Sequence, residues 1–282
     1  LALLYNGFGF GVEYNEPRGH EFMLRDIREI DSSRRSPGGV CLSCKTSHAQ
    51  ELVERHGIDY FSKPFDQVLQ WIPEQHRDTG VSCLSCHEPK TMALRILNRF
   101  SLGKALESMQ TDVSRLGHQD LRTLVCAQCH VTYVVEKDEQ MKSVALFFPW
   151  QRSRYGKISI EDIIAVLKSD PSFLEWKQAA TGFKLAFIRH PEFELYTNSS
   201  THWSAGLGCA DCHMPFTRVG NYKISDHRIM SPLKNDFKAC IQCHSRDQDW
   251  LRERVRFIQD RAMSLYIRAG YATAVCAKLF EK

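Results

Sequence analysis

The stretch Cys126-Ala127-Gln128-Cys129-His130 decides the fold, because the chain carries this pattern, with small changes, five times. Each copy has two cysteines separated by two residues, and in four copies a histidine follows the second cysteine. These pairs use ten of the eleven cysteines, and Cys276 stands alone. The pairs are Cys41/Cys44, Cys83/Cys86, Cys126/Cys129, Cys209/Cys212 and Cys240/Cys243, followed in turn by Lys45, His87, His130, His213 and His244.

Cys-x-x-Cys-His is the attachment signature of c-type haem. The two thiols bond to the haem vinyl groups, and the next side chain reaches the iron from one side. Structural zinc favours two pairs about 15–20 residues apart, whereas the nearest pairs here, at Cys209 and Cys240, begin 31 residues apart. Disulfides would leave the four histidines unexplained. We therefore predict five covalently bound haems, with zinc and disulfides as the alternatives, and we interpret Cys276 as a structural side chain.

The composition fits a globular protein. Of the 282 residues, 43% are hydrophobic and 25% are charged, which is ordinary for a globular domain. No run approaches the about 20 apolar residues that span a membrane. A net charge of +4 without a Lys/Arg-rich run does not indicate a nucleic-acid partner. Covalent haem attachment takes place in oxidising compartments, so we expect a periplasmic or otherwise extracytoplasmic protein.

Helical patterns dominate the chain. Apolar residues recur at helical spacing over 91–109 and 159–168, and a long, charged, periodic stretch covers 250–279. Short strands are predicted at 1–4 and 132–135.

No linker divides the chain, because the cysteine pairs thread its whole length. We predict a single pentahaem cytochrome c domain over 1–282, in which residues 249–282 begin a C-terminal helical region. The predicted fold class is mainly α: irregular chain wrapped around five haems, with few short strands and a long C-terminal helix. The chain starts at Leu1 and stops at Lys282 within a helical pattern, so we expect it to be part of a longer precursor.

Haems that only carry electrons need a distal ligand as well as the proximal histidine. The best distal candidates are His20, in a tight Pro-Arg-Gly-His loop, and His202 and His227, near the last two pairs. These three are one short of the four required, so the fourth is expected beyond Lys282. The histidines interpreted as ordinary surface or core residues are His48, His56, His76 and His118.

Lys45 stands where the other motifs have histidine. Its amine has an ordinary pKa of about 10.4 and must lose a proton to bind iron. A haem held differently from four others suggests an open opposite face, where a substrate binds. The alternatives are a degenerate haem site, or no haem there at all.

These motifs resemble the ammonia-forming cytochrome c nitrite reductases, a family of five-haem periplasmic enzymes. The resemblance runs from Leu1 to about Arg256, and the lysine-bearing haem motif is its most diagnostic part. The other stretches that carry it are Tyr14 to His20, Cys126 to Tyr133, Phe148-Pro149-Trp150, His190 to Glu194, Cys209 to Pro215 and Asp226-His227-Arg228.

The resemblance implies roles for individual residues. The catalytic trio, on the open face of the Lys45 haem, would be Tyr133, His190 and Arg35, with Arg34 as the close alternative for the arginine. His20 would be the distal ligand of the third haem, His227 of the second and His202 of the fifth. The fourth distal histidine lies in C-terminal helices that this chain lacks.

Two departures concern calcium. Where the family usually has a glutamate before the catalytic tyrosine and a glutamine before the catalytic histidine, this chain has Thr132 and Arg189. Calcium takes six to eight oxygen ligands. We therefore expect a calcium-lacking variant, in which Arg189 supplies the positive charge.

The resemblance implies six-electron reduction of nitrite to ammonium. Electrons would come from a quinol-oxidising membrane cytochrome or a small multihaem donor, and the enzyme would be a homodimer without a nucleic-acid partner. A non-catalytic electron-transfer cytochrome is the competing interpretation. A related enzyme acting on hydroxylamine or sulfite is another.

Overall fold

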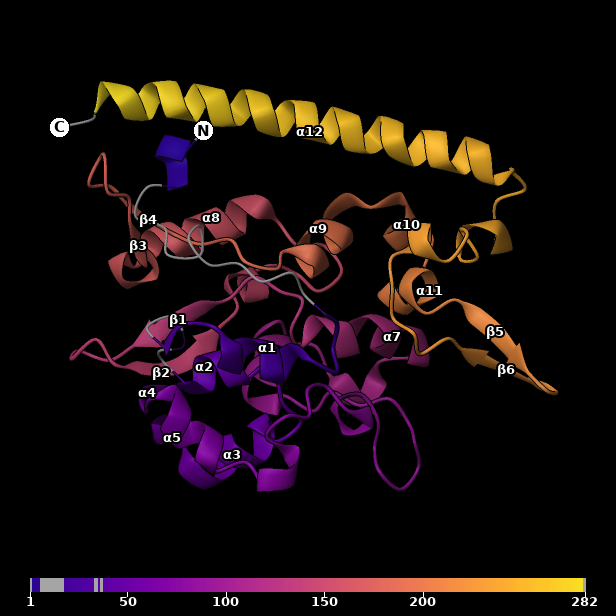
Figure 1. The fold of residues 1–282 in the computed structure, drawn as a ribbon, viewed down its shortest axis with the longest axis horizontal. Coiled ribbons are helices and arrows are strands. Elements are labelled where there is room, and N and C mark those ends of the chain that lie inside the picture. The colour runs from indigo at the N-terminus through magenta and orange to yellow at the C-terminus, as the bar shows by residue number, and fades with distance from the viewer. Residues whose placement is uncertain (1, 6–17, 33–34, 36–37, 281–282) are drawn as a thin grey trace. The chain divides into compact units, whose positions relative to one another are not determined.

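The computed structural model describes residues 2–5, 18–32, 35 and 38–280 (Figure 1). Arg34 and most of the Tyr14 to His20 stretch lie outside the described residues. Contacts divide the chain into two compact units. The larger unit comprises Phe8–Lys177 and Lys184–Ser204, and the smaller unit comprises Leu1–Gly7, Gln178–Phe183 and Ala205–Lys282.

The first core of the larger unit surrounds the Lys45 motif. Its helices are α1 (Met23–Glu29), α2 (Gly38–Leu42), α3 (Ala49–His56), α4 (Ile58–Ser62) and α5 (Phe65–Gln70). Leu42, Leu52 and Tyr60 are almost fully buried in it. A Cβ on Gly39 would lie 1.8 Å from the Tyr60 carbonyl oxygen, so α2 approaches α4 as closely as only glycine allows. This contact fixes the turn that carries Cys41 and Cys44.

The second core of the larger unit surrounds the third motif, and Trp150, Ile158 and Phe193 are buried in it. Ser159 caps α8 by accepting the N–H of Asp162 at 3.2 Å, as the sequence predicts. Strands β1 and β2 form an antiparallel hairpin, in which Val134 lies opposite Phe147. The regular elements are the π-helix η6 (Arg99–Gly103), α6 (Lys104–Ser108), α7 (His118–Ala127), β1 (Val134–Lys137), β2 (Ser143–Phe147), α8 (Ile160–Ser169), β3 (Trp176–Lys177), β4 (Lys184–Leu185), α9 (Glu192–Ser199) and α10 (Thr201–Ser204).

The smaller unit carries the last two motifs and the C-terminal helix. It contains α11 (Cys209–His213), the hairpin β5 (Phe216–Val219) and β6 (Tyr222–Ser225), and α12 (Gln248–Leu279). Asp247 caps α12 by accepting the N–H of Trp250 at 2.7 Å. Figure 1 shows α12 as one unbroken helix, which confirms the long C-terminal helix. Within the described residues, no helix combines the length and the apolar character needed to cross a bilayer.

The fold class is confirmed as mainly helical with few short strands, but two local predictions were wrong. Residues Ala2–Tyr5 form a 3-10 helix rather than a strand, since a short apolar run does not distinguish the two. The helix predicted over 91–109 begins only at Arg99. Before it, the Glu88 carboxylate accepts the N–H groups of Lys90 and Thr91 at 2.8 and 2.7 Å and holds a turn.

The domain prediction stays a proposal. Three cysteine pairs belong to the larger unit and two to the smaller unit. We propose that one haem-bearing domain covers both.

Candidate haem and catalytic site

The motifs that carry a histidine fold as closed turns, whereas in the first motif the N–H of Lys45 donates to the carbonyl of Leu42 at 2.9 Å. The N–H of His130 donates to the carbonyl of Cys126 at 2.9 Å, and those of His87 and His244 donate to the first cysteines of their own motifs at 2.8 Å. The fourth motif is the helix α11 itself. One helical turn places residues three apart on the same face, so each pair presents two thiols together with the next side chain.

This donor set fits haem c. No disulfide joins any of the eleven cysteines, all of which lie in the described part of the chain. Across that same part, no group of three His, Cys, Asp or Glu side chains is arranged to hold a metal ion. The thiols are therefore available for thioether bonds, and the structure gives the zinc and disulfide alternatives no support.

Two proximal candidates and one distal candidate have a fixed tautomer. The Nδ1 of His87 is 2.7 Å from the Met92 carbonyl, and that of His213 is 3.0 Å from the Met230 carbonyl. His227, a distal candidate, places Nδ1 2.9 Å from the Ser225 carbonyl. A carbonyl accepts only a protonated nitrogen, so Nε2 is left as the metal-binding nitrogen. His202 lies exposed in α10. The assignments of His202 and His227 to particular haems stay predictions.

The Lys45 motif meets the third motif through their second cysteines. The half-buried thiols of Cys44 and Cys129 lie close enough to shift each other's pKa. Burial raises the pKa of the Cys41 thiol, and the positive charges of Lys45, Arg189 and Arg35 each oppose that shift. All three cations therefore lie near the first pair.

Three histidines gather beside this contact. The ring centres of His20 and His130 are 6.0 Å apart, and those of His130 and His190 are 6.3 Å apart. A metal–imidazole bond is about 2 Å long, so two rings on opposite sides of one iron have centres roughly 6 Å apart. The separation of His20 from His130 supports their pairing on the third haem. His190 lies at a similar distance, so this measure alone does not assign the distal ligand.

His190 is held in an uncommon backbone conformation. Its φ is 47°, a left-handed value that non-glycine residues adopt at a cost of about 1 kcal/mol or more. Its Nδ1 lies 3.9 Å from the Glu192 carboxylate, which is equally far from Nδ1 of His130. Both histidines lower the pKa of Glu192. The segment therefore presents an exposed imidazole beside a carboxylate.

The ring of Tyr133 packs against the guanidinium of Arg189. The Arg189 guanidinium donates to the Tyr133 carbonyl at 3.1 Å and lies 4.9 Å from the centre of the tyrosine ring. It also pairs with Glu175. Burial raises the pKa of Tyr133, which Arg189 partly opposes. The phenol is thus neutral, and its hydroxyl can donate a hydrogen bond.

Arg35 is held at the edge of the first core. Its guanidinium pairs with Asp66 at 3.3 Å and lies 5.2 Å from the ring centre of Phe65. It lines a hollow of about 500 Å³. Its Nε is buried without a hydrogen-bond partner among the described residues.

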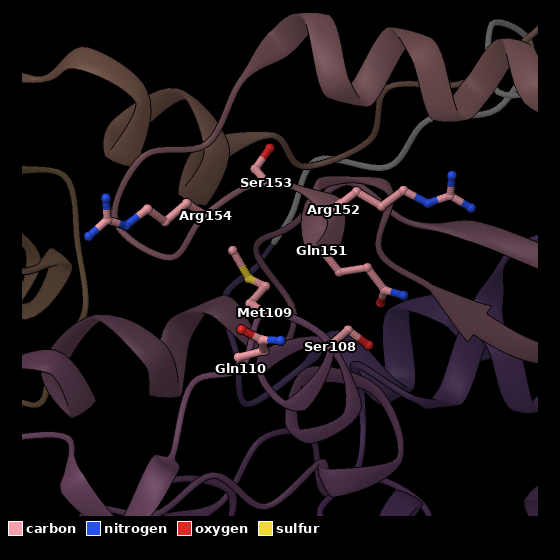
Figure 2. A pocket seen from close by; sticks show the side chains of 7 residues that line it. All are labelled: Ser108, Met109, Gln110, Gln151, Arg152, Ser153 and Arg154. Atoms are coloured by element: carbon pink, nitrogen blue, oxygen red, sulfur yellow. The ribbon is translucent and has the colours of Figure 1, made fainter.

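A larger hollow of about 660 Å³ lies elsewhere in the larger unit (Figure 2). Its lining residues are Ser108 to Gln110 and Gln151 to Arg154. Arg152 and Arg154 point in opposite directions in Figure 2. None of the predicted haem or catalytic residues lines it.

The sequence analysis missed Glu194. This side chain is 1% exposed, and its Oε1 accepts the N–H of Thr132 at 2.6 Å. The N–H of Phe193 donates to the His130 carbonyl at 3.2 Å, so α9 is clamped to the third motif. Burial raises the pKa of Glu194 to about 8. An acid in the first turn of a helix is ordinary in sequence, and nothing local signals that this one is buried.

Three of the four histidines interpreted as ordinary have close ring partners outside the cysteine motifs. The ring nitrogens of His48 and His76 lie 2.8 Å apart, and His56 stacks on Trp71 with ring centres 3.7 Å apart.

Comparison with known proteins places these features in a family. A protein-family model for cytochrome c552 matches residues 1–282. The chain is 34% identical to the cytochrome c nitrite reductase subunit NrfA of Nitratidesulfovibrio vulgaris, over 95% of this chain and 53% of that protein. It is 30% identical to cytochrome c-552 of Bacteroides fragilis strain ATCC 25285, over 93% of this chain and 52% of that protein. The chain thus spans about half the length of the curated relatives it matches.

A solved structure is also similar. The catalytic subunit NrfA of the cytochrome c nitrite reductase from Desulfovibrio desulfuricans ATCC 27774, described for its two calcium sites, superimposes with a TM-score of 0.80. The two chains share 30% identity over 94% of this chain and 58% of that chain.

Glu194 makes a testable contribution to stability. Its folded-state pKa of about 8 lies above the ordinary value of 4.5, so the folded protein holds a proton that the unfolded chain releases. That contribution is complete below pH 4.5 and is lost as the pH rises towards 8. Glu194→Gln should therefore gain stability over the unsubstituted chain from pH 5 to pH 8, by on the order of a few kcal/mol. Guanidinium denaturation at a series of pH values measures this.

Glu139→Gln, at an exposed glutamate between β1 and β2, is the matched control and should follow the unsubstituted chain. A stability difference for Glu194→Gln that stays constant with pH would show that Glu194 is not protonated in the folded state.

Proposed function

The chain belongs to the cytochrome c552 family, and from that premise we propose that it is the haem-bearing core of an enzyme that reduces nitrite to ammonium. The observation that carries this proposal is the surroundings of the first cysteine pair. Lys45 replaces the proximal histidine there, and Arg35 and Arg189 lie close enough to influence Cys41. An iron held by lysine beside two arginine cations suits a site that binds a small anion.

Haem c fits the residues present. Cys41 and Cys44 would hold it covalently, and it supplies an iron that exchanges electrons with nitrite. Lys45 would hold that iron through its amine, which must lose its proton to do so. The histidine motifs would hold four further haems, which store and deliver the six electrons that nitrite reduction consumes.

The neighbouring side chains bind nitrite and supply protons. Arg35 binds nitrite oxygens with its guanidinium through charge-assisted hydrogen bonds. His190 donates protons as N–O bonds break, and Glu192 orients its ring from 3.9 Å. Tyr133 relays protons from its neutral hydroxyl. Together these groups deliver the eight protons that accompany six electrons when nitrite becomes ammonium and two waters.

We propose that no calcium is needed beside Tyr133. The guanidinium of Arg189 already satisfies the Tyr133 carbonyl and pairs with Glu175. Calcium prefers six to eight oxygen ligands. The positive charge of Arg189 at this position would repel a calcium ion.

The partners and compartment follow from the same proposal. Electrons come from a quinol-oxidising membrane cytochrome or a small multihaem donor, and the enzyme works in the periplasm. Large apolar side chains are exposed along α12, including Phe257, Tyr266 and Val275. Such a helix supports a homodimer built through the C-terminal helical region.

Substitutions of the catalytic residues test the proposal. His190→Ala in the haem-loaded protein should lower nitrite turnover by about 10²- to 10⁴-fold, since a positioned proton donor contributes that much. Lys45→Ala should abolish turnover, because it removes a ligand of the catalytic iron. Nitrite consumption with reduced methyl viologen measures both. His118→Ala, at an exposed histidine of α7, should retain full activity. Full turnover by His190→Ala or Lys45→Ala would refute the assignment.

The calcium proposal has its own test. Turnover should be unchanged after exhaustive dialysis against a calcium chelator, because Arg189 provides the charge. Thr132→Glu combined with Arg189→Gln should make turnover depend on added calcium, since oxygen ligands replace the guanidinium. Loss of activity of the unsubstituted protein on chelation, with recovery on adding calcium, would overturn the proposal.

A further inference from the structure

A buried carboxamide, Gln128, lies inside the third cysteine motif, directly before Cys129. Its side chain is 4% exposed. Its Nε2 donates to the carbonyls of Ser85 and Val125, both at 3.0 Å. Its Oε1 accepts the N–H groups of Leu97 at 2.6 Å and Asn98 at 2.9 Å. Both donor hydrogens and both acceptor lone pairs of the carboxamide are therefore used.

These bonds connect the third motif to the second. Ser85 is the residue before Cys86, so a side chain from one haem-attachment turn holds the backbone of another. The connection requires a carboxamide. A carboxylate at position 128 would face the two carbonyl oxygens without a hydrogen to offer, and an apolar side chain would leave two backbone N–H groups without an acceptor.

Asn98 extends the connection to the first motif. It is 5% exposed, and its Nδ2 donates to the carbonyl of Ser43 at 3.1 Å. Ser43 is the residue before Cys44, so it has the same position in its motif as Ser85 and Gln128 have in theirs. The Oγ of Ser43 in turn donates to the carbonyl of Gly39 at 2.7 Å.

A second set of contacts closes the network. The hydroxyl of Ser47, two residues after Lys45, is 2.7 Å from that of Ser82 and 2.8 Å from that of Ser85. The first, second and third motifs are thus joined pairwise within the larger unit.

We propose that Gln128 is a positioning residue that sets the mutual placement of the first three haem-attachment turns, and through it the delivery of electrons to the Lys45 haem. The proposal rests on the proposed function in one respect, that haem is bound at these three motifs. Each haem would be held at its turn by the two cysteines of the pair and by the side chain that follows them. A hydrogen bond that fixes one turn against another therefore fixes one haem against another.

The fifth motif provides an internal comparison. Gln242 has the same position there, in Cys240-Ile241-Gln242-Cys243, but its side chain is exposed. The same residue at the same position in a haem motif is thus buried and fully bonded in one case and exposed in the other. Haem attachment itself does not require the glutamine, and the effect of Gln128 comes from its connections to the other motifs.

The test compares Gln128→Leu with Gln242→Leu in the full, haem-loaded chain. Intact mass counts the bound haems, and a potentiometric titration followed by visible spectroscopy gives their reduction potentials. Gln128→Leu should shift the potentials of the Lys45 haem and its neighbours. It should also lower kcat for nitrite about 10-fold or more with little change in KM, as does loss of an outer partner of metal ligands. Gln242→Leu should match the unsubstituted protein.

Unchanged potentials in Gln128→Leu, with all haems bound, would overturn the proposal. If that variant does not load haem, Asn98→Ala tests the proposal in its place. This substitution removes only the side-chain hydrogen bond to the Ser43 carbonyl. It should shift the potential of the Lys45 haem, and an unshifted potential would again overturn the proposal. Failure of the proposed function is separate: an unsubstituted protein that binds haem but does not consume nitrite leaves the comparison of potentials intact.

Discussion

The structure depends on the backbone hydrogen bonds that close the histidine-bearing cysteine motifs into single turns. In the second, third and fifth motifs, the N–H of the histidine reaches the carbonyl of the first cysteine at 2.8 to 2.9 Å. This bond brings two thiols and an imidazole to one face of the turn. Around these turns, short helices, 3-10 turns and two-stranded hairpins dominate the larger unit.

Packing then makes the Lys45 turn different from the others. It is connected to the third motif through Asn98 and Gln128, and it packs against α4 through the approach of Gly39 to Tyr60. The positive charges of Lys45, Arg189 and Arg35 influence its first cysteine. The substitution of histidine by lysine and the positive surroundings favour the same chemistry, the binding and reduction of a small anion.

The sequence predicts what is encoded locally and misses what depends on distant partners. The cysteine motifs, the cap at Ser159 and α12 are all encoded within a few residues, and the structure contains them. The burial of Glu194 depends on Thr132, and that of Gln128 on Ser85 and Asn98, each at least 30 residues away in sequence. No local pattern reveals such contacts. The helix predicted over 91–109 begins only at Arg99 for the same reason. Before it, the N–H of Arg95 donates to the carbonyl of Cys86 at 2.8 Å.

The electron paramagnetic resonance spectrum of the resting, haem-loaded protein tests the central claim most directly. The claim is that one haem, held by Lys45, has an open face while the histidine-held haems do not. It predicts a high-spin ferric signal that changes when nitrite is added, alongside low-spin signals from the other haems. A spectrum containing only low-spin signals, unaffected by nitrite, would contradict it and would identify the protein as an electron carrier.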